Sequence, residues 1–352
     1  MNKGPHPMKN KAIVLLLGAS VLLVPSTSTA KKNDKSTAVS GEITSGEGVL
    51  WRPPEDIKSR NLFYGPGGKE HEPRGTFKFV KEDMNGSNPK FDVVDENGVK
   101  WKVKLGAEAK PETVATRFVW AVGYFANEDY HLANLRVEGM PSLQRKHADQ
   151  FIQSDGSMND VRLKREIPGE KKVGTWQWRE DPFTGTREYN GLRVLMAVIN
   201  NWDLKDVNNA IYKEKHDQDR GGAQLIYMVS DLGGTFGSPN LRRTHEESKG
   251  NLESYRASKF IQDVQPDYVD LNVPARPSWV VLVNPHEYCS RLHLEWIGKH
   301  IPRADAKWMG QMLAQLSPAQ IRDAFRAAGY SQEEIEGFSS VMESRIAALN
   351  NL

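Results

Sequence analysis

The chain has little of three things that define common protein classes. Its 352 residues include one cysteine, Cys289, which cannot form a disulfide within the chain. Its apolar run Ala12–Val24 is about 13 residues long, shorter than the ~20 that a membrane-spanning helix needs. Its 47 basic and 45 acidic side chains nearly balance, so no basic field indicates a nucleic-acid ligand. We therefore expect no intrachain disulfide, no permanent membrane span and no nucleic-acid partner.

The first 30 residues have the pattern of a signal peptide. Lys9 and Lys11 precede the apolar run, and Ser28-Thr29-Ala30 follows it as a small-x-small cleavage site. We expect cleavage near Ala30 and an exported protein, either periplasmic or secreted. Residues 31–48 are polar, small and charged, which predicts a disordered linker. Residues 49–75 are rich in proline and glycine and predict an irregular lead-in.

Alternating hydrophobic residues predict a small antiparallel sheet in an N-lobe over residues 76–135. Asn97-Gly98 separates two alternating runs, which is a strong hairpin signal. Pro111 suits the start of a helix, and Gly123 suits its end. The expected elements are three strands and one helix, over residues 76–80, 91–95, 99–106 and 111–124.

The remaining residues, 136–352, predict a larger and mainly helical C-lobe. From Ala304 onward the pattern is helical, with capping-box sequences at Ser317 and Ser331. A small antiparallel sheet followed by a helix-rich part is an α+β arrangement with two lobes. Before residue 304 we expect a buried helix and a strand hairpin, over residues 191–201, 209–214 and 224–230.

Three polar residues near this hairpin fit a phosphoryl-transfer site. Asp203 can position an attacking hydroxyl, so it is the predicted catalytic carboxylate. Asn208, five residues later, and Asp231, in an Asp-Leu-Gly turn after the second strand, supply oxygen ligands that Mg²⁺ or Mn²⁺ prefers. Asn209 is a rival ligand, because it lies directly before the first strand. The hairpin is expected to bring these residues together.

A lysine on the predicted sheet supplies the positive charge that a phosphate group needs. Lys100, Lys102 and Lys104 alternate with apolar residues, so they share one face of their strand. Lys104 is the predicted phosphate-binding cation, held by Glu112 of the following helix, and Lys102 is its rival. Such a stripe is usually a solvated face. Glu112 also suits the first turn of a helix for the helix dipole alone.

These motifs resemble the atypical branch of the protein-kinase superfamily. NNWDLKDVNNAIY is similar to the catalytic loop of HipA-type kinases, and ETVATRFVWAVGY to the ion-pair helix of the secreted Golgi casein-kinase family. SDLGGTFG resembles the segment that carries the metal-binding Asp. The resemblance covers residues 76–237 and implies a two-lobed protein-kinase-like fold, ATP, and Mg²⁺ or Mn²⁺.

The chain also departs from the kinase pattern in three places. Asn201-Trp202 stands where ordinary kinases have a His before the catalytic Asp. The loop at residues 82–90 has one glycine instead of a Gly-x-Gly-x-x-Gly sequence, and no Ala-Pro-Glu follows Asp231. These departures concern nucleotide binding and the recognition of a protein substrate.

The sequence therefore predicts an exported atypical kinase that moves the γ-phosphate of ATP to an acceptor hydroxyl. The acceptor remains open between a protein, a lipid, a glycan and a small molecule. Two alternatives keep the same fold: a catalytically inactive binding or structural module, and a nucleotidyl transferase.

Overall fold

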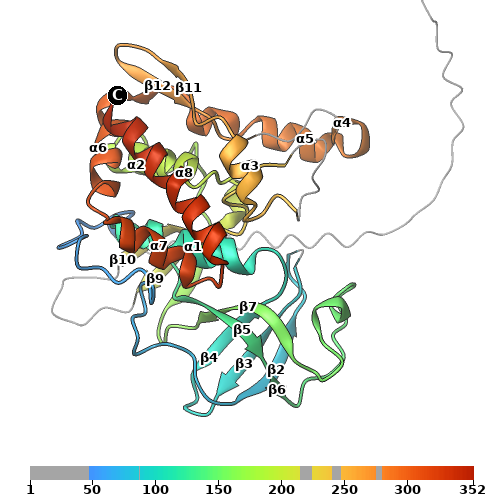
Figure 1. Cartoon of the computed structure of the whole chain (residues 1–352). Coiled ribbons are helices and arrows are strands. Elements are labelled where there is room, and N and C mark those ends of the chain that lie inside the picture. Colours follow the sequence, from blue (N-terminus) through green and yellow to red (C-terminus); the bar gives the residue numbers. More distant parts are fainter. Residues whose placement is uncertain (1–46, 87, 215–223, 240–246, 275–279) are drawn as a thin grey trace, which may run out of the picture. The chain divides into compact units, whose positions relative to one another are not determined.

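The computed structural model describes residues 47–352, apart from residues 87, 215–223, 240–246 and 275–279 (Figure 1). The predicted signal peptide, and all but the last two residues of the predicted linker, lie outside the described residues. None of the described helices has both the length and the apolar composition that crossing a membrane requires.

A six-stranded sheet forms the N-terminal part of the fold. Neighbouring strands follow the order β5-β7-β4-β3-β2-β6, and all of them pair antiparallel except β2 with β6. The Asp95 carboxylate closes the β3–β4 hairpin by accepting hydrogen bonds from the backbone N–H groups of Asn97 and Val99. The strands are β2 (Phe77–Asp83), β3 (Lys90–Asp95), β4 (Lys100–Lys104), β5 (Asp129–Leu135), β6 (Val137–Glu138) and β7 (Met158–Arg165).

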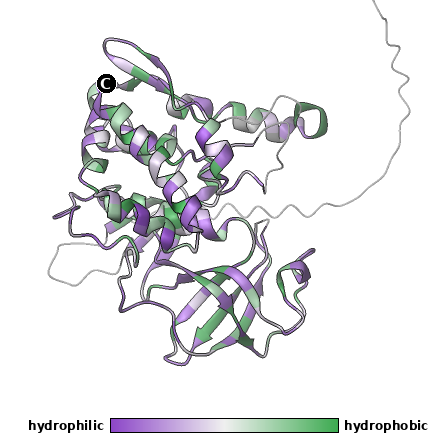
Figure 2. Ribbon diagram, viewed as in Figure 1, coloured by the Kyte–Doolittle hydropathy of each residue, from purple (hydrophilic) through white to green (hydrophobic). Residues whose placement is uncertain are grey.

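This sheet extends beyond the predicted N-lobe boundary at residue 135. Strands β2, β3 and β4 match the three predicted strands, but β6 and β7 lie past that boundary. Strand β7 pairs with both β4 and β5, so the sheet is complete only at Arg165. The strands carry both hydrophobic and hydrophilic residues (Figure 2), as expected for strands with one apolar face.

Helix α1 (Ala109–Ala121) connects the sheet to the helical part of the chain (Figure 1). It begins two residues before the predicted start at Pro111 and ends before Gly123, whose φ is +97°. Val114 and Phe118, one turn apart, are fully buried in the core that α1 shares with the C-terminal helices. Burying each such side chain stabilises the fold by roughly 1.5–3 kcal/mol. The helix is therefore held firmly in place.

A second sheet has four strands in the order β1-β10-β9-β8. Its β9–β10 hairpin matches the predicted one. The linker prediction is wrong for Glu47 and Gly48, because both lie in β1, which pairs parallel with β10. The edge of β10 offers backbone hydrogen-bonding groups that a neighbouring strand satisfies. The strands are β1 (Glu47–Val49), β8 (Lys171–Gly174), β9 (Asn209–Glu214) and β10 (Gln224–Val229).

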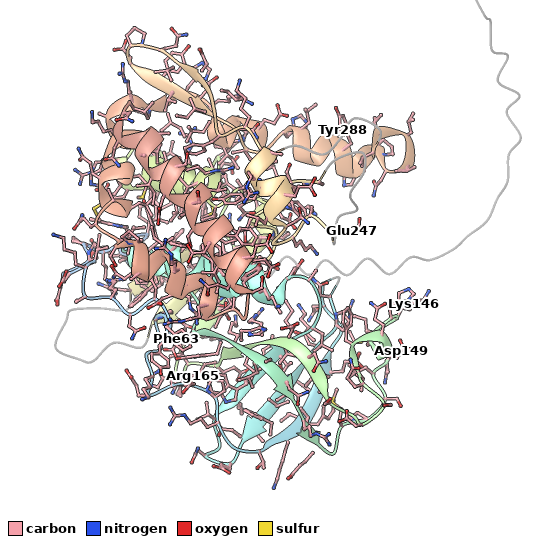
Figure 3. The ribbon with its side chains drawn as sticks, viewed as in Figure 1. Phe63, Lys146, Asp149, Arg165, Glu247 and Tyr288 are labelled. Atoms are coloured by element: carbon pink, nitrogen blue, oxygen red, sulfur yellow. The ribbon has the colours of Figure 1, made fainter. Side chains whose placement is uncertain are left out.

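The rest of the described chain is mainly helical. Ser317 and Ser331 form the predicted capping boxes of α7 and α8. Figure 3 shows the side chains on these elements, with Phe63 in the lead-in and Arg165 at the end of β7 among those labelled. The helices are α2 (Arg187–Val198), α3 (Leu252–Ala257), α4 (Val280–Val283), α5 (Pro285–Leu292), α6 (Arg303–Leu313), α7 (Pro318–Arg326) and α8 (Gln332–Asn350). Short strands β11 (Ile261–Val264), β12 (Tyr268–Leu271) and β13 (Ile301–Pro302) form a third sheet.

An aromatic core supports the segment that follows Asp231. The Phe236 ring packs against the rings of Phe325 and Phe338, with centroids 5.3 and 6.2 Å away. Edge-to-face ring contacts of this kind add about 0.5–1.5 kcal/mol each beyond the burial of area. The Asp231 segment is thus anchored to α7 and α8 a few residues after the turn.

Candidate active site

The predicted Lys104–Glu112 pair forms a direct contact between β4 and α1. The Lys104 Nζ lies 2.8 Å from Glu112 Oε2, and both side chains are buried. Lys102, the rival cation, is tied to other groups, because its Nζ lies 2.8 Å from Asp83 Oδ2 and 2.6 Å from Asp92 Oδ1. Lys104 therefore makes the predicted contact with Glu112, and Lys102 is paired with two other carboxylates.

Glu108 is a second carboxylate beside Lys104 that the sequence analysis missed. Its Oε2 lies 2.9 Å from Lys104 Nζ, and its Oε1 lies 2.8 Å from Lys249 Nζ. Because α1 begins earlier than predicted, Glu108 stands at its N-cap and one helical turn before Glu112. That spacing of four residues places both carboxylates on the face that meets Lys104. The spacing was visible in the sequence, but only a correct helix start makes it informative.

Asp231 completes the cluster from the other side. Its Oδ1 lies 3.5 Å from Lys104 Nζ and accepts a hydrogen bond of 3.2 Å from the backbone N–H of Gly233. Gly233 is required here, because a Cβ atom at that position would lie 2.6 Å from Cγ of Glu108. The glycine of the Asp-Leu-Gly turn thus allows α1 and the turn to approach each other closely.

The three carboxylates could hold a divalent metal ion. Ligand oxygens of Glu108, Glu112 and Asp231 lie within 4.8 Å of one another. Carboxylate oxygens are the ligands that Mg²⁺ and Mn²⁺ prefer, so this donor set fits the predicted metal. Glu108 and Glu112 thereby join Asp231 as candidate ligands.

Burial and charge act together on the ionisable groups of this cluster. Burial lowers the pKa of Lys104, but Asp231, Glu108 and Glu112 raise it more, so the ammonium form is strongly favoured. Burial raises the pKa of Glu108, and the neighbouring Lys104 and Lys249 outweigh it, which leaves that pKa well below its ordinary value. A buried charge is stable only when paired, and these groups pair with one another.

Glu112 has a second cationic partner, Arg162 of β7. The guanidinium Nη2 lies 2.9 Å from Glu112 Oε2, and Nη1 lies 3.3 Å from Asp129 Oδ1. Burial raises the pKa of Glu112 and outweighs the opposing effect of Arg162 and Lys104. Arg162 lies opposite Lys104 in the β4–β7 pairing. No local motif marked it, because its role depends on strand pairing.

Asp203 and Asn208 lie on one loop, which is tied to Asp231. The Asn208 side-chain Nδ2 donates to the backbone carbonyl of Asp203 over 2.7 Å, and the Asp231 backbone N–H donates to the Asn208 carbonyl over 3.1 Å. Gly234 allows the close approach, since a Cβ atom there would lie 2.9 Å from Cβ of Asp203. The predicted catalytic and metal-binding residues therefore come from adjoining segments.

The side chains of Asn208 and its rival Asn209 have different surroundings in the structure. Asn209 is fully buried, and its Nδ2 donates to the Trp176 carbonyl over 3.0 Å. Asn208 is half-buried, and the hydrogen bond of its Nδ2 leaves its side-chain oxygen for a ligand. Asn208 is thus the better candidate for metal binding. Trp202, directly before Asp203, is buried and donates its backbone N–H to the Gly234 carbonyl.

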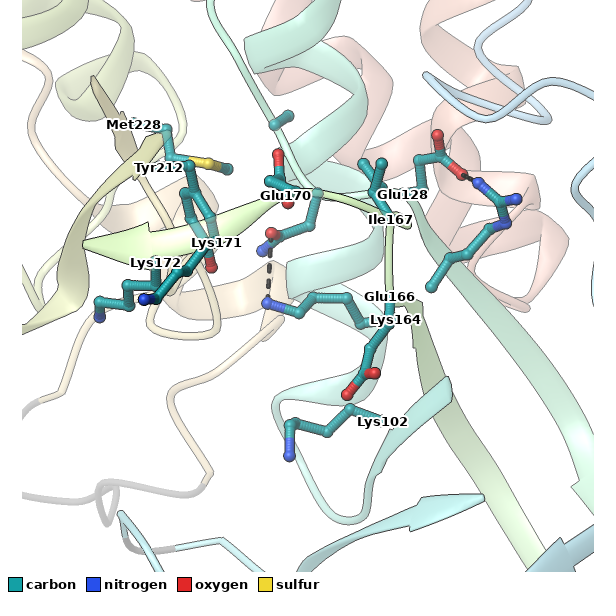
Figure 4. Close-up of a pocket in the computed structure, with 13 residues that line it drawn as sticks. Lys102, Glu128, Lys164, Glu166, Ile167, Glu170, Lys171, Lys172, Tyr212 and Met228 are labelled. Atoms are coloured by element: carbon teal, nitrogen blue, oxygen red, sulfur yellow. Dashed lines mark hydrogen bonds and ion pairs between the residues drawn. The ribbon is translucent and has the colours of Figure 1, made fainter. Parts of the chain in front are cut away.

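A pocket of about 360 Å³ opens beside this cluster (Figure 4). On one side it is lined by Lys102 and Lys164, which face each other in the β4–β7 pairing. Tyr212 of β9 and Met228 of β10 line it as well. Lys102 and Lys104 are two residues apart on one face of β4, so the pocket adjoins the Lys104 cluster. Five residues of the segment after β7 line it too, as Figure 4 shows: Glu166, Ile167, Glu170, Lys171 and Lys172.

Comparisons with known proteins give matches among solved structures only. No protein-family model matches the chain, and no curated protein matches its sequence. The proinflammatory kinase CtkA of Helicobacter pylori is similar over 78% of this chain and 95% of its own, with 10% identity and a TM-score of 0.40. The Golgi casein kinase with Mn and ADP bound is similar over 79% and 72%, with 11% identity and a TM-score of 0.36. The Rio2 kinase complex from Chaetomium thermophilum is similar over 78% and 72%, with 10% identity and a TM-score of 0.30.

The chain's own geometry carries the assignment of the fold. An antiparallel sheet bears Lys104, the next helix bears its Glu partners, and a helix-rich part follows the two loops that carry Asp203 and Asp231. This is an atypical protein-kinase-like fold of the α+β class, as the sequence predicted. The roles of the individual site residues are proposals, argued in the next section.

Proposed function

We propose that the protein is an atypical kinase that transfers the γ-phosphate of ATP to an acceptor hydroxyl with the help of a divalent metal ion. The observation that carries this proposal is the buried Lys104 ammonium. It contacts Glu108, Glu112 and Asp231 and lies beside a pocket large enough for a nucleoside. Such a centre provides a fixed positive charge for phosphate groups and a set of acidic metal ligands at one place.

Each predicted residue has a role in this reaction. Asp203, whose side chain is 26% exposed, accepts the proton of the acceptor hydroxyl. The acceptor oxygen forms a bond to the γ-phosphorus while the bond to the β–γ bridging oxygen breaks, and ADP leaves with that oxygen. Lys104 stabilises the phosphate charge, and Glu112 holds Lys104 in place.

The metal would be held by Asp231 and Asn208, with Glu108 and Glu112 as further carboxylate ligands. When bound, it neutralises phosphate charge and orients the phosphate oxygens. The proposal specifies only a hydroxyl group on the acceptor, because Asp203 is the one assigned residue that contacts the acceptor, at that hydroxyl.

Thermal melting tests the nucleotide site. We expect ATP with Mg²⁺ or Mn²⁺ to raise the melting temperature of the wild-type protein, because a ligand that binds only the folded state stabilises it. Asp231→Ala should abolish the metal-dependent part of this rise, whereas Asp149→Ala, on an exposed residue labelled in Figure 3, should retain it. No rise with any nucleotide and metal would instead favour the inactive binding module.

Asp203→Asn then tests the chemistry separately from binding. Loss of a general base typically costs about 10²–10⁴-fold in rate, so we expect ATP turnover to fall by that factor while nucleotide binding persists. Full activity in this variant would contradict the assigned role. Mass spectrometry of the modified acceptor distinguishes an added phosphate from an added nucleotide, the product of a nucleotidyl transferase.

We also propose that the protein is exported. The support is the sequence of residues 1–30, with its lysines, short apolar run and small residues before the cleavage site. N-terminal sequencing of the protein recovered from outside the cytoplasm should begin directly after Ala30. A protein that retains Met1 and stays in the cytoplasm would contradict export.

A further inference from the structure

The pocket beside the Lys104 cluster contains a lysine that the proposed reaction does not use. Lys164 of β7 is half-buried, and its Nζ donates to the side-chain oxygen of Asn127 over 3.4 Å. This long hydrogen bond is the dashed line at the centre of Figure 4. Asn127 is itself fixed, because its Nδ2 donates to the Ser230 carbonyl over 2.9 Å. Lys164 thus presents an ammonium group to the pocket and has one weak partner among the described residues.

The position of Lys164 places it at the base end of a bound nucleotide. Lys104 marks the phosphate end, next to Asp231. In the β4–β7 pairing Lys104 lies opposite Arg162, whereas Lys164 lies opposite Lys102, two residues farther from the phosphate end. Two residues along a strand are about 6.6 Å, so Lys164 lies one such step away from the pair Lys104–Arg162 along the sheet.

Part of the backbone that lines the pocket after β7 is already hydrogen-bonded within the protein. The Glu166 N–H donates to the Lys100 carbonyl over 2.9 Å, and the Ile167 carbonyl accepts from the Glu170 N–H over 3.2 Å. Side chains of the lining are therefore further groups that can read the base, and Lys164 is a half-buried one among them.

An ammonium group distinguishes the two purines. It has three N–H donors and no acceptor, so it pairs well with an oxygen atom and poorly with an amino group. Guanine presents two acceptors on its edge, O6 and N7, which lysine side chains bind, whereas adenine presents N7 and an amino group in place of O6. The lining carboxylates of Glu166 and Glu170 are acceptors of the kind that the N–H groups of guanine need.

We propose that Lys164 reads the 6-oxo group of a purine, so that the pocket binds guanine nucleotides at least as tightly as adenine nucleotides. Burial lowers the pKa of Lys164, and Arg162 lowers it further, which outweighs the opposing effect of Asp129, Glu112 and Glu170. A purine oxygen supplies a further partner for the ammonium group. This inference rests on the proposed nucleotide site and adds GTP to ATP as a phosphate donor.

Calorimetric titration with three nucleoside diphosphates in the presence of Mn²⁺ tests the proposal. ADP has an amino group at position 6, GDP has an oxygen there, and IDP has the same oxygen but lacks the 2-amino group of guanine. The variants are Lys164→Met, which removes the donors, and Lys164→Arg, which keeps them. Lys58→Met is the matched control, because Lys58 is an exposed lysine that does not line the pocket.

We expect the wild-type protein to bind GDP and IDP at least as tightly as ADP. Lys164→Met should weaken GDP and IDP binding by about tenfold or more, the usual effect of losing a hydrogen bond to a charged group. ADP binding should change by less than about threefold, and Lys164→Arg and Lys58→Met should keep the wild-type ranking. If Lys164→Met does not fold, Lys164→Gln replaces it and should shift the preference towards adenine, which glutamine pairs with well.

Two results would overturn the inference while leaving the nucleotide site intact. One is a wild-type protein that binds ADP more than about tenfold tighter than both GDP and IDP. The other is a Lys164→Met variant in which all three nucleotides weaken by the same factor. Absence of binding by any of the three would overturn the proposed function itself, and this inference with it.

Discussion

Lys104 and Lys164 lie on the same face of one sheet, on the neighbouring strands β4 and β7, yet their surroundings differ in kind. Three carboxylates surround Lys104 and raise its pKa despite its burial. Lys164 has an amide oxygen at 3.4 Å, and burial lowers its pKa. Lys104 is therefore a permanent charge whose partners belong to the protein. Lys164 is a charge that gains its best partner only when a ligand binds.

Both residues are lysines, and burial acts on both. The comparison therefore shows that the groups around a lysine determine its pKa and its availability to a ligand. A lysine enclosed by carboxylates keeps its position and its proton, which suits the stabilisation of phosphate charge. A lysine with a weak partner is costly to bury, and a ligand can offset that cost. The predictions below test this difference, from the largest expected effect to the smallest.

Replacing Lys104 should have the largest effect. Lys104→Met should lower the rate of phosphate transfer by about 10²-fold or more, because it removes a preorganised charge at the phosphate groups. The affinities for ADP and for GDP should fall equally in this variant. Lys164→Met, in contrast, should lower the affinity for GDP more than that for ADP. Lys100→Met, on the exposed end of β4, is the control and should leave rates and binding unchanged. Single-turnover kinetics and calorimetry measure the two quantities.

Glu112→Gln should affect stability most. The substitution leaves the buried Lys104 and Arg162 short of one negative charge, so we expect the free energy of unfolding to fall by about 3 kcal/mol. Urea unfolding measures this quantity. Glu166→Gln, an exposed carboxylate of the Lys164 pocket, should change it by less than about 0.5 kcal/mol. Equal losses in the two variants would show that the Lys104 cluster is not the more tightly paired region.

The Glu108–Lys249 ion pair should couple helix α1 to the segment after Asp231. A double-mutant cycle with Glu108→Gln and Lys249→Met should give a coupling free energy of about 1–3 kcal/mol in urea unfolding, since both side chains are buried. The matched cycle for the exposed pair Arg322–Glu336 should give at most about 1 kcal/mol. A Glu108–Lys249 coupling no larger than the exposed one would mean that this contact does not hold the segment in place.

Acid should weaken the ion pair between Asp83 and Lys102. Lys102 lies on β4 next to the Lys104 cluster and pairs with Lys164 across the strands. Burial raises the pKa of Asp83, but its hydrogen bond from Lys102 lowers it more, to about 2. A depressed pKa stabilises the folded protein above the ordinary pKa of 3.8, and this contribution is lost as the pH falls from about 4 through about 2. Asp83→Asn should therefore lower stability at pH 6 but make little difference near pH 2.

Urea midpoints at several pH values measure this effect. Asp149→Asn, which changes an exposed carboxylate of the short helix Asp149–Phe151, is the control and should follow the wild-type pH dependence throughout. A variant Asp83→Asn that loses stability equally at pH 6 and at pH 2 would contradict the role of the Asp83–Lys102 pair.

Local patterns in the sequence were enough to predict many elements of this fold. Strands β2, β3, β4, β9 and β10 and the caps of α7 and α8 follow from alternation and from short capping motifs. The extent of the first sheet was not predicted, because β7 joins it by pairing with strands from which it is distant in the sequence. Such pairing leaves no local signal.

The candidate site likewise contains residues that local motifs indicated and one that they did not. Lys104, Glu112, Asp203, Asn208 and Asp231 could each be named from motifs with fixed spacing. Glu108 was missed because the start of α1 was placed two residues too late.

The sequence by itself determined the residue types and local spacings that phosphoryl transfer needs, because such motifs act over a few residues of backbone. Only the tertiary structure decided the environment of each charge. It gave Lys104 three carboxylates and placed Arg162 and Lys249 behind two of them. It also placed Lys164 in the lining of a pocket, where the side-chain oxygen of Asn127 is its one weak hydrogen-bond partner among the described residues. The reason is physical: the pKa of a buried group depends on charges within a few ångströms in space, which the order of residues along the chain does not reveal.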